Sequence, residues 1–180
     1  MLRRWSTVEY LEQPEQMTPQ ELVWGVLREP PAPLYGHQSV VGRVFVILDV
    51  HNRAHRLGIV CVSPMDVVLD PARALVVQPD VFFVAKERID LIRGQMWGAP
   101  DLVVEVASRR TMRRDRTTKL AWYRRYGVKE CWLVEPGRER VVIVDLSLRG
   151  RKAYRIVEGP DRLRSTVLPL LHVTAADCFP

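Results

Sequence analysis

The chain has 180 residues, of which 47% are hydrophobic and 27% are charged, and its formal net charge is +6. This length suits one domain with its own core, so we expect a single domain over residues 1–180. The hydrophobic content excludes disorder of the whole chain, and no apolar run approaches the roughly 18 to 20 residues of a membrane span. The positive charge favours an anionic partner but does not name it.

Three cysteines, Cys61, Cys131 and Cys178, are odd in number and far apart in the sequence. Their spacing matches no zinc motif, and the apolar neighbours of Cys61 and Cys131 are typical of buried reduced thiols. The N-terminal residues include acidic side chains from Glu9 onward and lack the apolar stretch of a signal peptide. We therefore expect a soluble cytoplasmic protein in a reducing compartment.

The first predicted elements are a short helix and a hairpin. Ser6 and Glu9 have the spacing of a capping box, which predicts a helix from Ser6 to about Glu12. Residues 21–28 form two apolar arms about Gly25, which indicates two short extended segments. Three prolines between residues 30 and 33 then predict a loop.

A long helix and three strands are predicted next. Apolar residues between 38 and 56 recur along one face of a helix, in spite of several β-branched side chains. Three apolar runs follow, and prolines separate or interrupt them, which favours strands of an antiparallel or mixed sheet. The runs cover residues 59–62, 67–69 and 75–84.

Residues 101–107 predict a central strand, because they are apolar on both faces except at Glu105. A second long helix is predicted from Arg113 to Tyr126, and Gly127 stands where a left-handed helix cap belongs. Thr174 is the expected N-cap of a final short turn that reaches Phe179. Further strands are predicted over residues 130–134, 141–146 and 154–157.

Two carboxylates lie inside hydrophobic strands. Asp80 follows Pro79 in one apolar segment, and Glu105 interrupts another. An ionised carboxylate in such a setting is costly unless a charge or a metal compensates it. Two of them on neighbouring strands would share one hard cation such as Mg²⁺. Structural ion pairs with the many arginines are the alternative, and the residues alone leave the two open.

The Pro79-Asp80 pair and the later Glu105 resemble the signature of PD-(D/E)xK nucleases, which is loose by itself. Longer segments are more specific and are similar to the Uma2 family, also called DUF820, along nearly the whole chain. These segments are residues 21–25, 33–38, 78–80, 99–108, 114–123, 127–134 and 167–170. The resemblance implies an α/β (α+β) fold with a restriction-endonuclease-like αβββαβ core, in which helices flank a mixed sheet.

The resemblance also implies a metal-dependent endonuclease that hydrolyses phosphodiester bonds of DNA. Asp80 and Glu105 would then bind Mg²⁺ or Mn²⁺, together with the backbone carbonyl of Val106. The lysine of the signature is missing, because Ala107 stands in its place. The resemblance assigns its role to Lys119, displaced onto the following helix; the alternative for Lys119 is a surface position on a basic helix.

Glu21 aligns with an acidic residue of the family and is a further candidate metal ligand. Residues 18–21 also have the pattern of a capping box, which would give Glu21 a purely structural role. Asp66 is a candidate for holding the ligand side chains in place without binding the metal itself. Asp101 is not chosen as the signature aspartate, because Asp80 is the better match to the family. His37 is expected to cap the long helix or to contact a ligand.

Five arginines gather within eight residues, and they are Arg109, Arg110, Arg113, Arg114 and Arg116. Such a cluster attracts phosphate and predicts contact with the DNA backbone, although a solvated helix face has the same composition. The competing functional hypothesis is a catalytically inactive protein that binds nucleic acid or another partner with the same fold. A homodimer stays open, since the sequence shows no self-complementary signature.

Overall fold

The computed structural model describes residues 3–14, 18–107 and 114–180, and the side chains of residues 114–116 and 151–152 lie outside the description. Of the predicted arginine cluster, Arg109, Arg110 and Arg113 therefore lie outside the described residues. Arg114 and Arg116 belong to a described helix, but their side chains are not described.

The described strands form two six-stranded mixed sheets. The central sheet contains β3 (Gly58–Val62), β6 (Val81–Ala85), β9 (Leu102–Val106), β10 (Glu130–Glu135), β11 (Arg140–Asp145) and β12 (Tyr154–Glu158). Its order is β12-β11-β10-β9-β6-β3, and β9 and β10 are its parallel pair. The second sheet contains β1 (Glu21–Val23), β2 (Val26–Arg28), β4 (Val67–Asp70), β5 (Leu75–Val77), β7 (Ile92–Arg93) and β8 (Gln95–Trp97), in the order β2-β1-β5-β4-β8-β7.

Three α-helices accompany the sheets in the described residues: α1 (Thr7–Leu11), α2 (Tyr35–His55) and α3 (Arg114–Tyr126). Short 3₁₀ segments are η1 (Lys86–Leu91), η2 (Pro136–Arg138), η3 (Gly150–Ala153) and η4 (Ala176–Cys178). In chain order, α2, β3, β6, β9, α3 and β10 reproduce the predicted αβββαβ core. The prediction of a mixed sheet flanked by helices is therefore confirmed.

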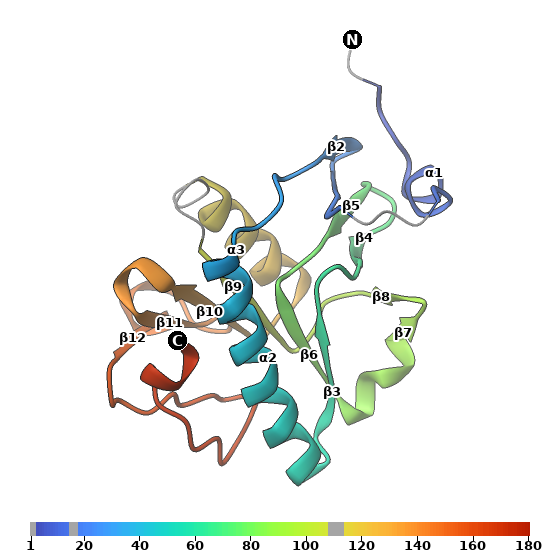
Figure 1. The fold of residues 1–180 in the computed structure, drawn as a ribbon. Coiled ribbons are helices and arrows are strands. Elements are labelled where there is room, and N and C mark those ends of the chain that lie inside the picture. The colour runs from blue at the N-terminus through green and yellow to red at the C-terminus, as the bar shows by residue number, and fades with distance from the viewer. Residues whose placement is uncertain (1–2, 15–17, 108–113) are drawn as a thin grey trace.

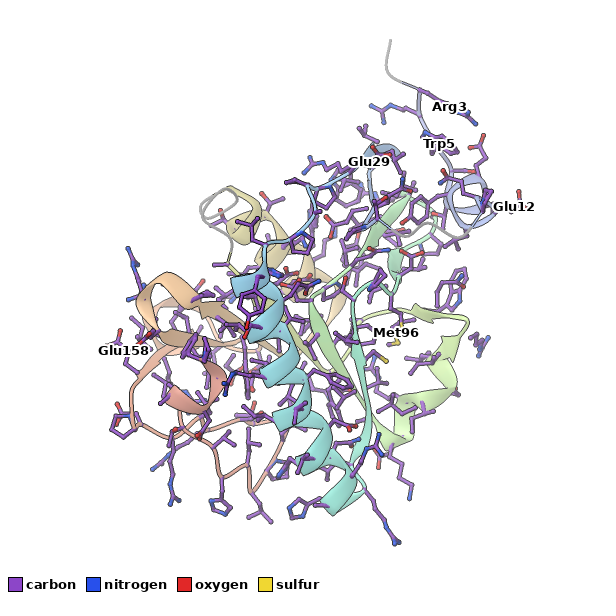
Figure 2. All side chains as sticks on the ribbon, viewed as in Figure 1. Arg3, Trp5, Glu12, Glu29, Met96 and Glu158 are labelled. Carbon is purple, nitrogen blue, oxygen red and sulfur yellow. The ribbon has the colours of Figure 1, made fainter. Side chains whose placement is uncertain are left out.

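Two apolar layers lie on the faces of the central sheet. Helix α2 crosses one face and α3 lies behind the other (Figure 1). The α2 layer also contains C-terminal side chains, whereas the α3 layer joins the central sheet to the second sheet. Side chains fill the space between the layers, and Glu12, Glu29 and Glu158 lie at the periphery (Figure 2). The central sheet is therefore buried on both faces, as its apolar strands require.

The local signals for the helices explain their boundaries. In α1 the predicted capping box is present, because the backbone N–H of Ser6 donates to the Glu9 carboxylate at 2.7 Å and the Ser6 hydroxyl accepts from Glu9 at 3.2 Å. Gly127 has a φ of +95°, as expected of a left-handed cap after α3. Helix α2 begins at Tyr35, before the predicted start at residue 38. The sequence does not indicate this start, because the N-cap residue Leu34 forms no side-chain capping hydrogen bond.

Two other predictions need correction. The second sheet was not distinguished from the central one, and the strand at residues 95–97 was missed because its segment contains glycines and polar residues. Thr174 does not cap the last turn, since η4 begins at Ala176 with Ala175 as its N-cap. Instead, the backbone N–H and hydroxyl of Thr174 donate to the Asp177 carboxylate at 2.7 and 2.8 Å.

Asp101 is a structural carboxylate with no exposed surface. It accepts from the backbone N–H of Ala85 at 2.8 Å and pairs with Arg88 at 3.0 Å and Lys129 at 2.7 Å. Burial alone would raise the pKa of this carboxyl, but the three donors together hold the pKa below its ordinary value. These contacts tie the loop before β9 to β6 and to the start of β10.

Replacement of Asp101 by Ala is expected to lower the free energy of unfolding by about 3 kcal/mol, because the backbone N–H of Ala85 and the partly buried guanidinium of Arg88 lose their acceptor. Urea unfolding measures this change. Asp49→Ala is the matched control, since Asp49 forms an exposed helical pair with Arg53 and such pairs contribute roughly 1 kcal/mol or less. Equal losses in the two variants would contradict the structural role of Asp101.

No helix in the described part of the chain combines the length and the apolar character needed to cross a lipid bilayer. Cys131 and Cys178 are buried, and Cys61 is partly buried.

Candidate functional site

Asp80 and Glu105 meet at one end of the central sheet. Strands β6 and β9 pair Val81 with Val104, so the antiparallel register places Asp80 opposite Glu105. Residues opposite one another in such a pair project from the same face, with Cβ atoms about 5 Å apart. The backbone N–H of Val106 donates to Asp80 Oδ2 at 2.7 Å, which fixes that carboxylate against the end of β9.

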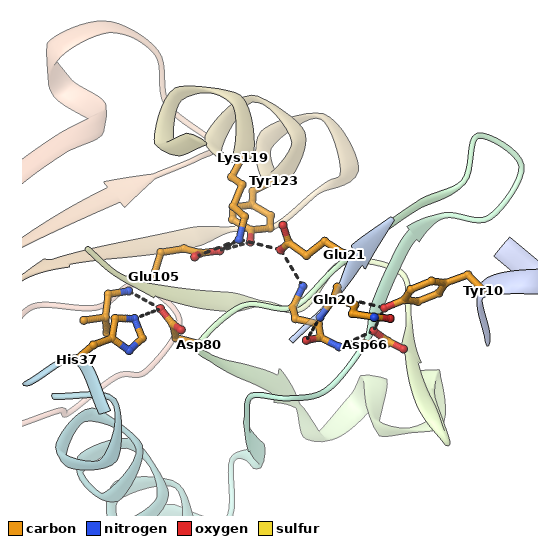
Figure 3. A network of polar contacts seen from close by, with 11 residues as sticks. Tyr10, Gln20, Glu21, His37, Asp66, Asp80, Glu105, Lys119 and Tyr123 are labelled. Carbon is orange, nitrogen blue, oxygen red and sulfur yellow. Dashed lines mark hydrogen bonds and ion pairs between the residues drawn. The ribbon is translucent and has the colours of Figure 1, made fainter. Parts of the chain in front are cut away.

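Helix α3 supplies a lysine and a tyrosine to the same place (Figure 3). Lys119 and Tyr123 are four residues apart, so they lie on one face of the helix. Lys119 Nζ is 3.1 and 3.3 Å from the two oxygens of Glu105. The Tyr123 hydroxyl donates to Glu105 Oε1. Lys119 thus brings its ammonium group to the end of β9.

Glu21 reaches the site from β1 of the second sheet. Its Oε1 is 2.9 Å from Lys119 Nζ and accepts the backbone N–H of Gln78 at 3.1 Å. The alternative in which Glu21 belongs to a capping box is wrong, because the residue begins a strand. Lys119 therefore lies between two carboxylates that come from different sheets.

A polar network behind Glu21 contains Asp66. The Gln78 side chain donates to Asp66 Oδ1 at 2.9 Å, and its amide oxygen accepts from the backbone of Gln20 at 3.3 Å. The Tyr10 hydroxyl also donates to Asp66 Oδ1, at 3.0 Å. Asp66 thus holds Gln78, which in turn holds Glu21, so α1 and the second sheet share one network with the site (Figure 3).

His37 lies in the first turn of α2, with Nε2 3.4 Å from Asp80 Oδ2. Its Nδ1 is buried and has no hydrogen-bond partner among the described residues. The hydrogen bond with Asp80 raises the pKa of His37, although burial opposes this shift. The contact with Asp80 shows that His37 belongs to the site.

Burial and neighbouring negative charges together raise the pKa of Glu105. Burial raises the pKa of Glu105 to about 7; the charges of Asp80 and Glu21 also raise it, while Lys119 and Tyr123 lower it. For Lys119, burial would lower the pKa, but the charges of Glu105 and Glu21 raise it above its ordinary value. Lys119 is therefore protonated, and its charge balances only one of the carboxylates around it.

The donor set fits a hard divalent cation. Mg²⁺ is commonly held by one or two carboxylates and several waters, and carboxylate oxygens suit Mn²⁺ equally. The repulsion among Asp80, Glu105 and Glu21 that raises the pKa of Glu105 is the kind of excess negative charge that such a cation relieves. Among the described side chains, no group of three or more His, Cys, Asp and Glu residues could hold a metal by itself. The fit is thus to a cation that keeps waters in its shell.

Other candidate residues lie away from this site or serve the core. Asp101 is the structural carboxylate of the η1 region. The rings of His51 and His55 contact each other with centroids 4.5 Å apart and a tilt of 46°, and His51 Nε2 is 2.9 Å from the carbonyl oxygen of Pro169. Their pairing fits a packing role better than a metal site.

Sequence reasoning does not identify Tyr123 as a site residue, because an aromatic side chain in such a helix is most simply a core residue. The signal was its spacing of four residues from Lys119, which puts both side chains on one face. Gln78 was also missed, since its contribution depends on its backbone N–H and on partners distant in sequence.

A family model described as "Uma2: Putative restriction endonuclease" matches residues 7–176. The chain belongs to the Uma2 family. The crystal structure of a putative nuclease belonging to DUF820 from Anabaena variabilis ATCC 29413 is similar over 97% of both chains, with a TM-score of 0.80 and 18% sequence identity. At this identity the likeness shows the fold alone. A search of curated protein sequences found no match.

Proposed function

We propose that this Uma2 protein is a metal-dependent endonuclease that hydrolyses phosphodiester bonds of DNA. The observation that carries the proposal is the meeting of Asp80 and Glu105, opposite each other on neighbouring strands, with Lys119 bound to Glu105. Membership of a family whose model is described as "Putative restriction endonuclease" supports the reaction class. Fold alone would not, because one fold supports many functions.

Asp80, Glu105 and the backbone carbonyl of Val106 would hold Mg²⁺ or Mn²⁺. Glu21 is proposed to complete the shell through a bound water, because the described side chains include no group of three that could hold a metal directly. When bound, the cation supplies an activated water and stabilises negative charge on phosphate. The N–H of Val106 keeps Asp80 in place, and Lys119 does the same for Glu105. These residues set the orientation of the carboxylates before substrate binds.

Lys119 has the catalytic role that its charge and position support. Its ammonium group is protonated next to two carboxylates, so Lys119 places a positive charge at the end of β9. In the proposed reaction its ammonium group contacts the phosphate and stabilises the charge that develops there. The arginines at positions 109, 110, 113, 114 and 116 are proposed to hold the flanking DNA backbone.

The site also supports the proposal that residues 1–180 act as one domain. Glu21 comes from the second sheet, Glu105 from the central sheet and Lys119 from α3, and the three are joined by ion pairs. Separation of the two sheets would leave the partly buried carboxylate of Glu21 without its cation.

Nicking of supercoiled plasmid tests the proposed function. The purified protein should convert the plasmid to open circles with Mg²⁺ or Mn²⁺, and a chelator should stop the reaction. Single-stranded RNA in a parallel reaction distinguishes the two nucleic acids. Salt-sensitive plasmid binding without cleavage under any metal would instead favour the inactive binding protein.

Metal affinity is expected to increase as the pH rises from 6 to 8. The pKa of Glu105 is raised to about 7, so the carboxyl must lose a proton before it can bind a cation at pH 6. Below this pKa the dissociation constant should fall by about tenfold for each unit of pH, and above it the curve should flatten. Calorimetric titration of Mn²⁺ at several pH values measures the curve, and a flat profile from pH 5.5 to 8 would contradict the assignment.

A further inference from the structure

Two side chains of α3 donate hydrogen bonds to Glu105, and they differ in conformational freedom. The Lys119 ammonium is shared between Glu105 and Glu21, and its side chain is 17% exposed. The Tyr123 hydroxyl donates to Glu105, and the residue has no exposed surface. A flexible charged side chain and a rigid neutral one therefore hold the same carboxylate.

The ring of Tyr123 is fixed by its surroundings. It lies in the apolar layer between α3 and the central sheet, together with Leu120, Val103, Cys131 and Leu133. A close-packed interior leaves an aromatic ring no alternative position without a cavity or a clash. The hydroxyl therefore stays at the end of β9 even if the ammonium group moves.

Lys119 cannot serve Glu105 and a phosphate equally. In the proposed reaction its ammonium group turns toward the phosphate, which weakens its contact with the carboxylate. A donor that remains is then needed to keep Glu105 oriented. The position of the Tyr123 hydroxyl meets this need, because its ring is held by packing and not by charge.

We propose that Tyr123 is a positioning residue, whose hydroxyl orients the Glu105 carboxylate for the divalent cation while Lys119 is free to act on the phosphate. This inference rests on the proposed metal-dependent function. It assigns to Tyr123 a role beyond packing. A purely structural tyrosine would need a buried partner for its hydroxyl but would have no effect on metal affinity.

Tyr123→Phe tests the proposal, because it removes the hydroxyl and keeps the ring. Tyr126→Phe is the matched control: Tyr126 lies on the same helix, and its hydroxyl donates to Asp70 Oδ2 at 2.7 Å, away from Glu105. Mg²⁺ and Mn²⁺ are titrated calorimetrically into the full-length wild type and both variants at pH 8. Thermal melting without metal checks the fold of each protein.

The expected result is a dissociation constant about tenfold higher for Tyr123→Phe, as is typical when a residue that orients a metal ligand is lost. Tyr126→Phe should bind metal as the wild type does. In plasmid nicking, Tyr123→Phe should need more metal for half-maximal rate, while its rate at saturating metal stays within about threefold of the wild type.

Unchanged metal affinity in Tyr123→Phe, beside a wild type that binds metal, would overturn the positioning role and leave the proposed function intact. Absence of metal binding by the wild type would overturn both. A melting temperature of Tyr123→Phe that falls by more than about 10 °C would assign the hydroxyl to the stability of the core and would also overturn the proposal.

Discussion

Asp80→Asn and Glu105→Gln are each expected to slow plasmid nicking by about 10³-fold or more. Both changes keep the size of the side chain and remove the negative charge that would hold the cation. Loss of the activated water and of charge stabilisation on phosphate removes several kcal/mol of transition-state stabilisation, and about 4 kcal/mol corresponds to 10³-fold. The two effects should not add in the double variant, because the carboxylates serve one cation.

Nicking rates at saturating Mn²⁺ measure this effect, together with calorimetric titration of the metal. Asp49→Asn is the matched control, since Asp49 lies on α2 in an exposed pair with Arg53 and contacts no site residue among the described ones. The catalytic assignment would be wrong if the Asp80 and Glu105 variants nicked as fast as this control. Melting of each variant shows whether a slow rate comes from unfolding.

Lys119→Met is expected to slow nicking by about 10²-fold at saturating metal while metal binding persists. One positive group at the developing charge is lost, and removal of a single such donor typically costs 10² to 10³-fold. Metal affinity should be equal to or higher than in the wild type, because the ammonium group no longer competes for Glu105 and Glu21. A loss of nicking rate without a loss of metal affinity therefore distinguishes Lys119 from the metal ligands.

The same variant should be less stable without metal, by roughly 3 kcal/mol, because two partly buried carboxylates lose their cation. Addition of Mg²⁺ should then raise its melting temperature more than that of the wild type. Lys119→Arg serves as the control that keeps the charge but changes its geometry. Metal that fails to stabilise Lys119→Met would argue against a cation site between these carboxylates.

The amino-acid sequence by itself determined the family and the αβββαβ core, and it predicts Asp80, Glu105 and Lys119 as site residues. Long apolar patterns and caps are local, so they predict α1, most of α2, α3 and the central strands. A carboxylate inside an apolar strand can also be recognised from the sequence alone. It indicates a site because burial of an uncompensated charge is costly. The motifs of a family carry the rest of this information.

Only the tertiary structure decided which of these residues meet. The register between β6 and β9 places Asp80 opposite Glu105, and register depends on pairing between segments more than 20 residues apart. The second sheet brings Glu21 to Lys119, a contact that no local pattern encodes. The position of Tyr123 also depends on tertiary packing. Its sequence context is that of a core aromatic, and only the packing of α3 on β9 directs its hydroxyl to Glu105.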